Sequence, residues 1–452
     1  MGKVDSRVAK GRGRIHLVGI GGVGMSALAQ ALLDVGYAVS GSDRFLDSGD
    51  TTDTLERLRT QGVAMYPQNG EGVAGAGRLV VSTAIESDNA DLVAATRHGI
   101  EVIHRADQLA ELAQGHRLIA ITGTSGKSSV AAMLGWLLQE AGLDPAVVNG
   151  AGVVGWGERG RIASVRKGAG EWMVIEADES DRSLMAFKPE HAIITNAGAD
   201  HFGEEETLEL FDRFRGNVSG VIIDGVAEAV VAEGTAVPAP EAAVTSGWGS
   251  SFVFRGVKFS LALPGMHNIL NAWQAVRLAA EIGVPLTKLA AGLATFGGIE
   301  RRLQRVGELC GAVVIDDYAH NPDKIAAAWS TLAAVFERVV LVWRPHGYGP
   351  LRKMLDGFEA AFVKVMRSHD LLILLPVYDM GGTADRSVNS AALVSRLTAR
   401  GLPVCAVRNI DQAEEVLRRA AAPGVALVTC GARDPGLPRL AKRLVEPFDI
   451  LH

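Results

Sequence analysis

Short apolar runs alternate with longer helix-like stretches along almost the whole chain. The run RIHLVGI (residues 14–20) leads through glycines into the helical pattern GGVGMSALAQALLDVG, and the same order recurs from residue 117 and again from about residue 305. Strands that alternate with helices favour parallel sheets, because each helix returns the chain to the edge at which the next strand begins. The sequence therefore predicts an α/β protein with mainly parallel sheets.

The length of the chain indicates more than one domain. A chain of 452 residues exceeds what a single hydrophobic core commonly organises. The helix-like segment ADQLAELAQGH (106–116) closes the first set of strands, and a third set begins near residue 305. We therefore predict three domains, comprising residues 1–114, 115–304 and 305–452.

Charge and cysteine content exclude several classes of protein. The net charge of −6 provides no general attraction to nucleic acid or to an anionic membrane. Cys310, Cys405 and Cys430 are far apart and form no CxxC pair, which favours a reducing compartment over a disulfide framework or a zinc knuckle. No apolar stretch approaches the length that spans a bilayer. We expect a cytoplasmic monomer or homodimer that binds small molecules, not nucleic acid or a membrane.

The segment ITGTSGKSS (121–129) joins a strand-like run to a helix-like one. Such a loop directs backbone N–H groups and the positive end of a helix dipole at one point, which suits phosphate. Gly123 and Gly126 would let the backbone approach an anion, Lys127 would meet the outer phosphates, and the Ser128 hydroxyl would bind Mg²⁺. The full phosphate-loop pattern has glycine where this chain has Ile121, so a glycine-softened turn with a surface lysine is the alternative.

A second glycine-rich loop, GIGGVG, follows the first strand. Gly19, Gly21 and Gly24 have the spacing of a dinucleotide-binding turn, and Asp43 ends the next strand, where an acid would bind a ribose. A dehydrogenase is therefore one interpretation. A UDP-sugar fits the same two features equally well, and a helix packed tightly on its sheet needs no ligand at all.

Further polar residues follow predicted strands or begin a helix. Glu176 and His201 suit a Mg²⁺ ion shared with phosphates, and a solvated acidic loop without a metal is the alternative. Asn268 and Asn271 lie one turn apart at a helix start, where they could contact an adenine edge or cap the helix. In the last third of the chain, polar side chains gather after two strands, including Asp317, His320, Arg344 and His346. Taken singly, each of them is interpreted as ordinary surface. Because ligands bind at the carboxyl ends of parallel strands, their grouping there makes these positions candidates for a site.

The chain resembles the ATP-dependent Mur ligase family nearly from end to end. The motifs that carry the resemblance include HLVGIGGVGMSALAQALL, VVSTAIESDNADLVAA, ITGTSGKSS, GEWMVIEADESD, TNAGADH, LPGMHNILNA, DDYAHNPDKI and CGARDPG. The resemblance implies a Rossmann-like N-terminal domain that binds a UDP substrate, a central ATPase domain of phosphate-loop type and a Rossmann-like C-terminal domain. Within the family, the motifs are most similar to those of alanine-adding members.

The resemblance also implies a reaction. The lactyl carboxylate of UDP-N-acetylmuramate attacks the γ-phosphate of ATP, and the amine of an amino acid, with L-alanine favoured, attacks the resulting acyl phosphate. ADP and phosphate are released, and the product belongs to peptidoglycan precursor synthesis. Phosphorylation is needed because a free carboxylate is a poor acyl donor, and the protein contributes alignment and charge neutralisation.

Roles for individual residues follow from the resemblance alone. Lys127, His201, His320, Arg344 and His346 would be catalytic, the last three where the amino acid and the intermediate are received. Mg²⁺ would be held by Ser128, Glu176 and His201. The UDP substrate would be bound by Gly19, Gly21, Gly22, Gly24, Asp43, Ser82 and Thr83. ATP would be bound by Thr122, Gly123, Thr124, Ser125, Gly126, Lys127, Ser128, Ser129, Asn268, Asn271, Arg302 and Asp317, with the asparagines facing adenine, Arg302 facing phosphate and Asp317 facing the ribose.

The chain departs from the alanine-adding pattern at several positions. Ser125 and Ser128 stand where histidine and threonine are usual, Asn321 replaces the second histidine of an HHP motif, and Gly347 replaces an arginine. The last two changes concern the amino acid more than ATP. A ligase for another amino acid or a peptide, and a non-catalytic nucleotide-binding relative, therefore remain alternatives beside the dehydrogenase.

Overall fold

The computed structural model describes residues 13–47, 49, 51–157, 160–197, 204–226, 240–379 and 385–446. It divides into two compact units. Unit 1 comprises Met1–Thr245 and Gly249–Gly297, and unit 2 comprises Ser246–Trp248 and Gly298–His452.

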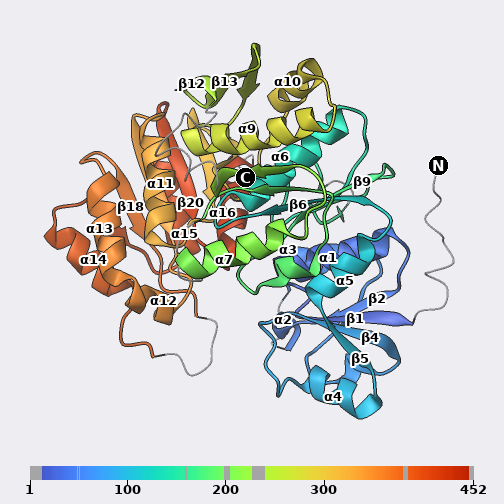
Figure 1. Cartoon of the computed structure of the whole chain (residues 1–452). Coiled ribbons are helices and arrows are strands. Elements are labelled where there is room, and N and C mark those ends of the chain that lie inside the picture. Colours follow the sequence, from blue (N-terminus) through green and yellow to red (C-terminus); the bar gives the residue numbers. More distant parts are fainter. Residues whose placement is uncertain are drawn as a thin grey trace. The chain divides into compact units, whose positions relative to one another are not determined.

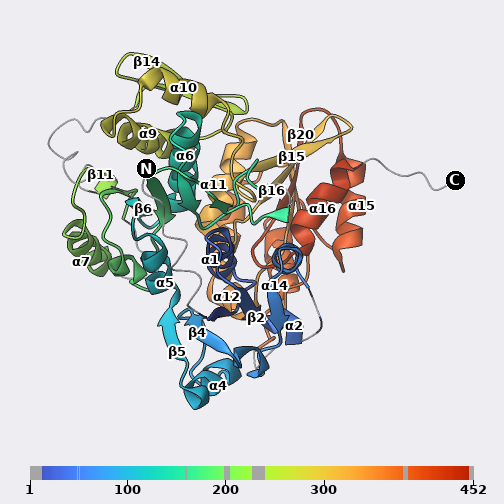
Figure 2. The same cartoon turned by 90° about the vertical axis from the view of Figure 1, so that its right-hand side faces the viewer.

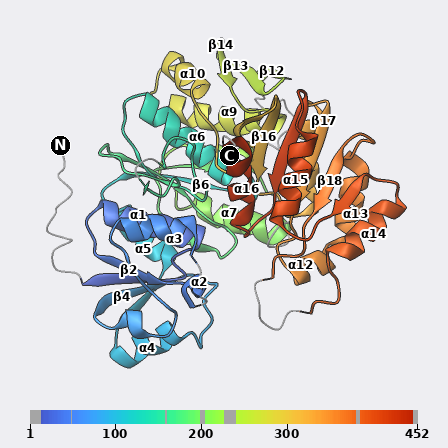
Figure 3. The ribbon, with the colours of Figure 1, turned by 180° about the vertical axis from the view of Figure 1, so that it is seen from behind.

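The first sheet of unit 1 is five-stranded and parallel, in the order β3-β2-β1-β4-β5. Because the chain moves from β1 to one side and later returns to β4 on the other, β1 and β4 form a topological switch point, where such sheets bind ligands. Helices α1, α3 and α5 lie on one face and α4 on the other (Figure 3). The elements are β1 (Arg14–Val18), α1 (Val23–Asp34), β2 (Val39–Ser42), α2 (Arg44–Asp47), α3 (Asp53–Thr60), β3 (Ala64–Tyr66), η1 (Glu71–Val73), β4 (Ala76–Val81), α4 (Ala90–His98), β5 (Glu101–His104) and α5 (Arg105–Leu112).

The second sheet of unit 1 has six strands in the order β11-β10-β6-β9-β7-β8, and only the edge strand β8 is antiparallel. Helix α6 is buried along most of its length, and α9 lies beside it (Figures 1 and 2). The elements are β6 (Arg117–Thr122), α6 (Lys127–Glu140), β7 (Ala146–Val148), β8 (Val165–Arg166), β9 (Trp172–Glu176), η3 (Ser183–Ala186), β10 (His191–Ile194), α7 (Glu204–Arg215), β11 (Ile222–Asp224), α9 (Met266–Glu281) and α10 (Leu286–Ala294). A small three-stranded sheet adds β12 (Glu241–Ser246), β13 (Gly249–Phe254) and β14 (Val257–Leu261).

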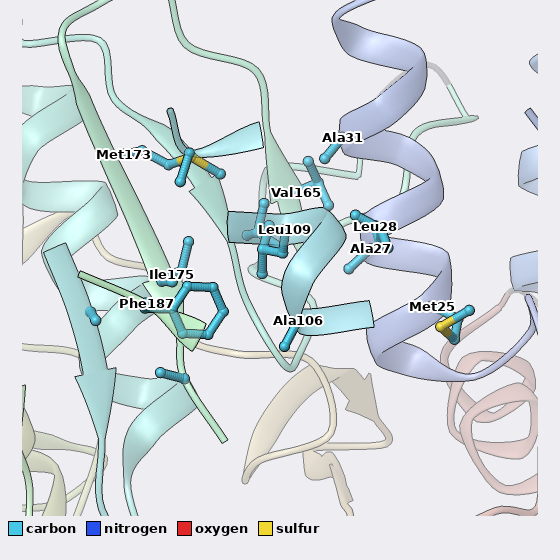
Figure 4. Close-up of a cluster of buried hydrophobic side chains, with 14 of the residues drawn as sticks. Met25, Ala27, Leu28, Ala31, Ala106, Leu109, Val165, Met173, Ile175 and Phe187 are labelled. Carbon is cyan, nitrogen blue, oxygen red and sulfur yellow. The ribbon is translucent and has the colours of Figure 1, made fainter. Parts of the chain in front are cut away.

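One hydrophobic cluster joins the two sheets of unit 1. Met25 and Leu28 of α1 belong to it together with Leu109 of α5, and so do Ile175 of β9 and Phe187 (Figure 4). Apolar burial of this kind stabilises by about 25 cal/mol per Å². The UDP-type loop and the phosphate-type loop are therefore carried by parts of one compact unit.

The sheet of unit 2 has six strands in the order β15-β16-β20-β17-β18-β19, and only β15 is antiparallel to its neighbour. Alternate residues of β17 face opposite sides: Leu341 and Trp343 pack into one core with α11, α13 and α14, and Val340 and Val342 into another with α15 and α16. The elements are β15 (Gln304–Leu309), β16 (Ala312–Asp317), α11 (Pro322–Ala333), β17 (Arg338–Trp343), α12 (Tyr348–Lys353), α13 (Leu355–Val365), β18 (Leu371–Leu374), α14 (Ser390–Ala399), β19 (Val404–Ala406), α15 (Ile410–Ala420), β20 (Val425–Cys430) and α16 (Gly436–Val445).

The prediction of an α/β protein with mainly parallel sheets is confirmed. The exceptions are the edge strands β8 and β15 and the small sheet β12–β14, which the sequence did not predict as a unit. No helix in the described ranges has the length and apolarity needed to cross a membrane.

Candidate active site

The loop between β6 and α6 depends on its two glycines. Gly123 has φ +126° and Gly126 has φ +86°, values that side chains other than glycine rarely adopt. A Cβ on Gly123 would overlap the Thr195 hydroxyl and lie 2.9 Å from the Thr195 nitrogen, and one on Gly126 would lie 2.6 Å from Asn271 Oδ1. Both positions therefore exclude a larger residue by conformation and by space.

The end of β10 holds this loop in shape. Thr195 Oγ1 donates to the Ser125 carbonyl at 2.6 Å, and the Asn196 amide both donates to that carbonyl and accepts from the Ser125 N–H, at 2.9 and 3.0 Å. The Asn196 carbonyl accepts from Thr124 N. The predicted residues Thr122 to Ser129 thus run from the end of β6 through an ordered turn into α6, at the carboxyl edge of the sheet. Thr195 is a supporting residue that the sequence did not indicate.

Lys127 begins α6 with its side chain folded over the loop. Its Nζ donates to the Gly123 carbonyl at 2.8 Å and to Glu179 Oε2 at 2.6 Å. The Lys127 and Glu179 side chains are 12% and 3% exposed, and Glu179 Oε1 is buried without a hydrogen-bond partner in the described part. Burial raises the pKa of Glu179 although Lys127 opposes the shift. The lysine ammonium is therefore held by a poorly solvated carboxylate.

The two described candidates for a magnesium site lie beside the same loop. Glu176 pairs in register with Ile121 of β6, and its Oε2 accepts from Gly150 N at 2.8 Å. Ser128 is buried in the first turn of α6. His201 lies outside the described residues, within which no three His, Cys, Asp or Glu side chains gather as a metal cluster. A Mg²⁺ ion at phosphates commonly takes only one or two protein oxygens and completes its shell with phosphate and water, so a carboxylate and a hydroxyl fit it.

The asparagines of α9 differ in what they contact. Asn268 is buried and its Nδ2 donates to the Pro264 carbonyl at 2.8 Å, which fastens the start of the helix. Asn271 instead lies against Gly126, and three residues later Gln274 donates to the Thr195 carbonyl at 3.0 Å. The helix is thereby attached to the phosphate-type loop. Asn271 is placed at that loop, whereas the amide of Asn268 is used within the fold.

In the first sheet, Asp43 organises the glycine-rich loop. Gly21 N donates to Asp43 Oδ2 at 2.8 Å and Phe45 N donates to Oδ1 at 3.1 Å. A Cβ on Gly24 would lie 2.8 Å from Arg105 Nη1. Arg105 therefore reaches the start of α1, where an anion would be favoured. Arg105 was not predicted, because it follows a different strand, β5.

The remaining predicted UDP-site residues lie at the two loops of the switch point. Gly19 has φ +74°, and a Cβ there would lie 3.6 Å from Ile85. Ser82 and Thr83 follow β4 directly, and the Ser82 carbonyl accepts from Ile85 N. Gly22 precedes α1 as its N-cap residue. The loops after β1 and β4 are thus brought together, as the predicted site requires.

In unit 2, Asp317 is buried and engaged by the backbone. Its oxygens accept from Leu303 N at 2.8 Å and Ala319 N at 2.7 Å. Burial raises the pKa of Asp317 to about 6, although these two hydrogen bonds and the positive charge of Arg302 oppose the shift. Asp317 therefore fixes the chain that enters this sheet, beside the predicted phosphate ligand Arg302.

His320 and His346 come together after β16 and β17. Their ring centroids are 5.1 Å apart, and the Tyr318 ring centroid lies 5.5 Å from that of His320. Burial, reinforced by the positive charges of His320 and Arg433, lowers the pKa of His346 to about 4, so this imidazole is neutral near pH 7. Arg344 is directed elsewhere: it donates to Asp434 at 2.8 Å and to the Pro376 carbonyl at 3.0 Å.

Comparison with known proteins decides which family these features belong to. Three family models match: "Mur ligase family, catalytic domain" over residues 14–117, "Mur ligase middle domain" over 121–211, and "Mur ligase, glutamate ligase domain" over 301–433. A UDP-N-acetylmuramate–L-alanine ligase of Geobacter sp. (strain M21) is 36% identical over 449 residues, which cover 93% of this chain and 94% of that protein. The chain belongs to the Mur ligase family.

Other members extend the likeness. The UDP-N-acetylmuramate–L-alanine ligase of Rhizobium meliloti (strain 1021) is 35% identical over 462 residues, covering 94% of this Mur ligase and 95% of its own length. The crystal structure of the UDP-N-acetylmuramate-alanine ligase of Thermotoga maritima superposes with a TM-score of 0.79 at 25% identity, over 96% of this chain and 98% of that one. A murein peptide ligase of Psychrobacter arcticus 273-4 shares the fold, with a TM-score of 0.63 at 20% identity over 96% and 98% of the two chains. The predicted family and three-domain fold are confirmed.

Proposed function

We propose that this Mur ligase joins L-alanine to the lactyl carboxylate of UDP-N-acetylmuramate, with conversion of ATP to ADP and phosphate. The observation that carries the proposal is the extent of the match. Two ligases named for this reaction cover 93% and 94% of the chain at 36% and 35% identity. All three domains are therefore shared, and not the nucleotide-binding part alone.

The loop after β6 would bind the ATP phosphates. Its backbone N–H groups and the start of α6 favour an anion there, and Lys127 is the cation within the loop. ATP would draw the Lys127 ammonium from Glu179 toward the β- and γ-phosphates. The substrate carboxylate oxygen would bond to the γ-phosphorus as the bond to the ADP oxygen breaks, and positioned cations lower the barrier of such a transfer.

Mur ligases use ATP, generally with Mg²⁺. In this chain Ser128 and Glu176 would hold the ion, with His201 as a further ligand that the resemblance implies. The ion would supply neutralisation of the phosphate charge. Asn271 would face the adenine, and Arg302 and Asp317 of unit 2 would face the phosphate and the ribose.

The UDP substrate would occupy the switch point of the first sheet. The loop from Gly19 to Gly24 would receive the diphosphate at the start of α1, and Arg105 would add a positive charge. Ser82 and Thr83 would form the opposite wall. We place the three functional domains at residues 1–114, 115–304 and 305–452.

The acyl phosphate would then meet the amino acid in the C-terminal domain. The amine nitrogen would attack the acyl carbon, phosphate would leave with its bonding electron pair, and the proton lost by the nitrogen would go to the departing phosphate. His346, neutral near pH 7, would accept a hydrogen bond from the amine through its unprotonated ring nitrogen. Alignment of the two reactants is the main contribution of such a site.

The decisive experiment measures ADP release from ATP, Mg²⁺ and UDP-N-acetylmuramate with a panel of amino acids and peptides. We expect release that depends on L-alanine and yields the amide product by mass spectrometry. Preference for another amino acid or a peptide would instead favour the alternative that Asn321 and Gly347 suggest. NADH binding detected by fluorescence, without ADP release, would contradict the ligase proposal.

A further inference from the structure

An amino-acid substrate carries a carboxylate that needs a positive partner. In unit 2 the strands β16, β20 and β17 are adjacent and parallel, so the segments that follow them meet at one edge of the sheet. His320 follows β16 and His346 follows β17. The segment after the central strand β20 therefore lies between the two that carry these histidines.

Arg344, which the resemblance placed where the amino acid and the intermediate are received, already has partners within the protein. Its Nη1 donates to Asp434 and its Nε to the Pro376 carbonyl, and the side chain is only 21% exposed. Asp434 is itself buried and also accepts from Gly436 N at 2.8 Å. Arg344 thus connects β17 to the segment after β20, and drawing it to a ligand would leave Asp434 as an unpaired buried charge.

Other arginines near this edge also have partners. Arg301 bonds Asp316 at 3.1 Å and the Gly431 carbonyl at 2.5 Å. Arg352 is paired with Asp385, and Arg386 donates to Asp379 at 2.8 Å. Each of these guanidinium groups is neutralised or fixed by the protein.

Arg433 differs from them in two respects. It is exposed, and no hydrogen bond or ion pair to another described residue engages its side chain; its charge acts on His346. Its backbone also has φ +66°, a left-handed conformation that costs a non-glycine residue roughly 1 kcal/mol. Glycine would adopt this conformation without strain, so the turn itself gives no reason for an arginine here, and the side chain is the feature that needs an explanation.

We infer that Arg433 binds the α-carboxylate of the incoming amino acid, next to His346 and His320. A guanidinium can donate two parallel hydrogen bonds to one carboxylate, which fixes both its position and its orientation. With the carboxylate held, the amine would be directed toward the histidines and the acyl phosphate. This inference rests on the proposed function and identifies the residue that recognises the acid group of the substrate.

The test is the variant Arg433→Gly, because glycine accepts φ +66° without strain. We expect an unchanged or higher melting temperature, a KM for L-alanine raised roughly ten- to a hundredfold for loss of a charge-assisted pair, and unchanged KM values for ATP and the UDP substrate. Arg433→Lys keeps the positive charge but cannot donate two parallel hydrogen bonds to one carboxylate. Its KM for L-alanine should therefore lie between the values of the wild type and of Arg433→Gly.

The readout that separates carboxylate binding from a structural role is L-alaninamide, which has the amine but no carboxylate. Wild-type enzyme should favour L-alanine over the amide, and Arg433→Gly should lose that preference without a change in its KM for the amide. Arg255→Gly is the matched control, since Arg255 is also left-handed, with φ +48°, in the β13–β14 turn.

The outcomes distinguish this inference from the proposed function. An equal rise in KM for L-alanine and L-alaninamide, or an unchanged ratio, would overturn the role of Arg433 while wild-type ligation stands. If wild-type enzyme instead prefers another amino acid or a peptide, the proposed substrate is wrong. The same comparison of that substrate with its amide then still decides whether Arg433 recognises a carboxylate.

Discussion

Lys127 and Glu179 form a 2.6 Å ion pair at the start of α6, and both side chains are largely withdrawn from water. The pair joins the phosphate-type loop to the segment after β9. A buried ion pair has no net charge, but removing one of its members leaves the other as an unpaired buried charge, which destabilises the protein. The lysine that would bind ATP is therefore also a structural residue in the nucleotide-free protein.

We predict that Lys127→Ala lowers amino-acid-dependent ADP release at least a hundredfold and also lowers the melting temperature. Activity falls because the γ-phosphate loses its cation, and stability falls because Glu179 is left buried without a partner. ADP release and thermal unfolding, followed in parallel, measure the two effects.

The double variant Lys127→Ala/Glu179→Gln separates these two losses. Replacing the carboxylate by a neutral amide should recover much of the melting temperature without any recovery of ADP release. Recovery of activity in the double variant would show that Lys127 serves the fold alone.

Gly123 provides a second test of the phosphate-type loop. We predict that Gly123→Ala destabilises the protein by roughly 2–4 kcal/mol, because it combines an unfavourable φ with overlap against Thr195, and that it raises the KM for ATP more than tenfold. Denaturant unfolding and steady-state kinetics measure the two changes.

Gly142→Ala is the matched control, since Gly142 has φ +87° but open space around its Cβ position. This change should cost about 1 kcal/mol from backbone strain alone and leave the KM for ATP unaltered. A similar destabilisation by both variants would mean that Thr195 does not confine the loop.

Local patterns predicted the parts of the site that one strand, loop and helix define. The segment from Arg117 to Glu140 is such a unit, and its glycines and lysine lie within a few residues of one another. The glycine-rich loop after β1 is another, and there Asp43 is brought to the loop by the ordinary pairing of neighbouring strands. In both cases the spacing of residues over a short stretch of sequence is sufficient to predict the loop.

The partners that come from distant segments were not visible in the sequence. Glu179 is 52 residues from Lys127, and its role depends on the pairing of β6 with β9. Arg433 looks like any charged loop residue until its left-handed backbone is seen, together with the lack of a counterion among the described residues. Arg344 fits the family motif by position, yet the sequence does not reveal that Asp434 engages it. Which charged side chains are paired within the protein depends on tertiary contacts, and these cannot be read from the sequence.

Asp43 offers a test of whether the UDP and ATP sites are separate. We predict that Asp43→Ala weakens binding of the UDP substrate at least tenfold, because the loop at Gly21 loses its carboxylate acceptor, and changes ATP affinity little. Calorimetric titration of each ligand measures this directly. Equal losses for both ligands would contradict two independent sites within unit 1.

The lowered pKa of His346 lets us predict how the stability of the protein depends on pH. Its pKa is about 4 in the folded protein and about 6.5 when unfolded, so between these values the unfolded chain binds the proton more tightly. The free energy of unfolding should therefore fall as the pH drops from 6.5 toward 4. The full shift corresponds to about 3.4 kcal/mol at 1.36 kcal/mol per pKa unit, and partial solvent screening reduces this to on the order of 1–2 kcal/mol.

The variant His346→Asn isolates this contribution, because asparagine does not titrate. Urea unfolding of both proteins at pH 7.5 and pH 5 gives the difference in their free energies of unfolding at each pH. Wild type should lose stability relative to the variant on acidification. A gap between the two proteins that stays constant would mean that the imidazole titrates normally, and that neither burial nor the charges of His320 and Arg433 keep it neutral for the incoming amine.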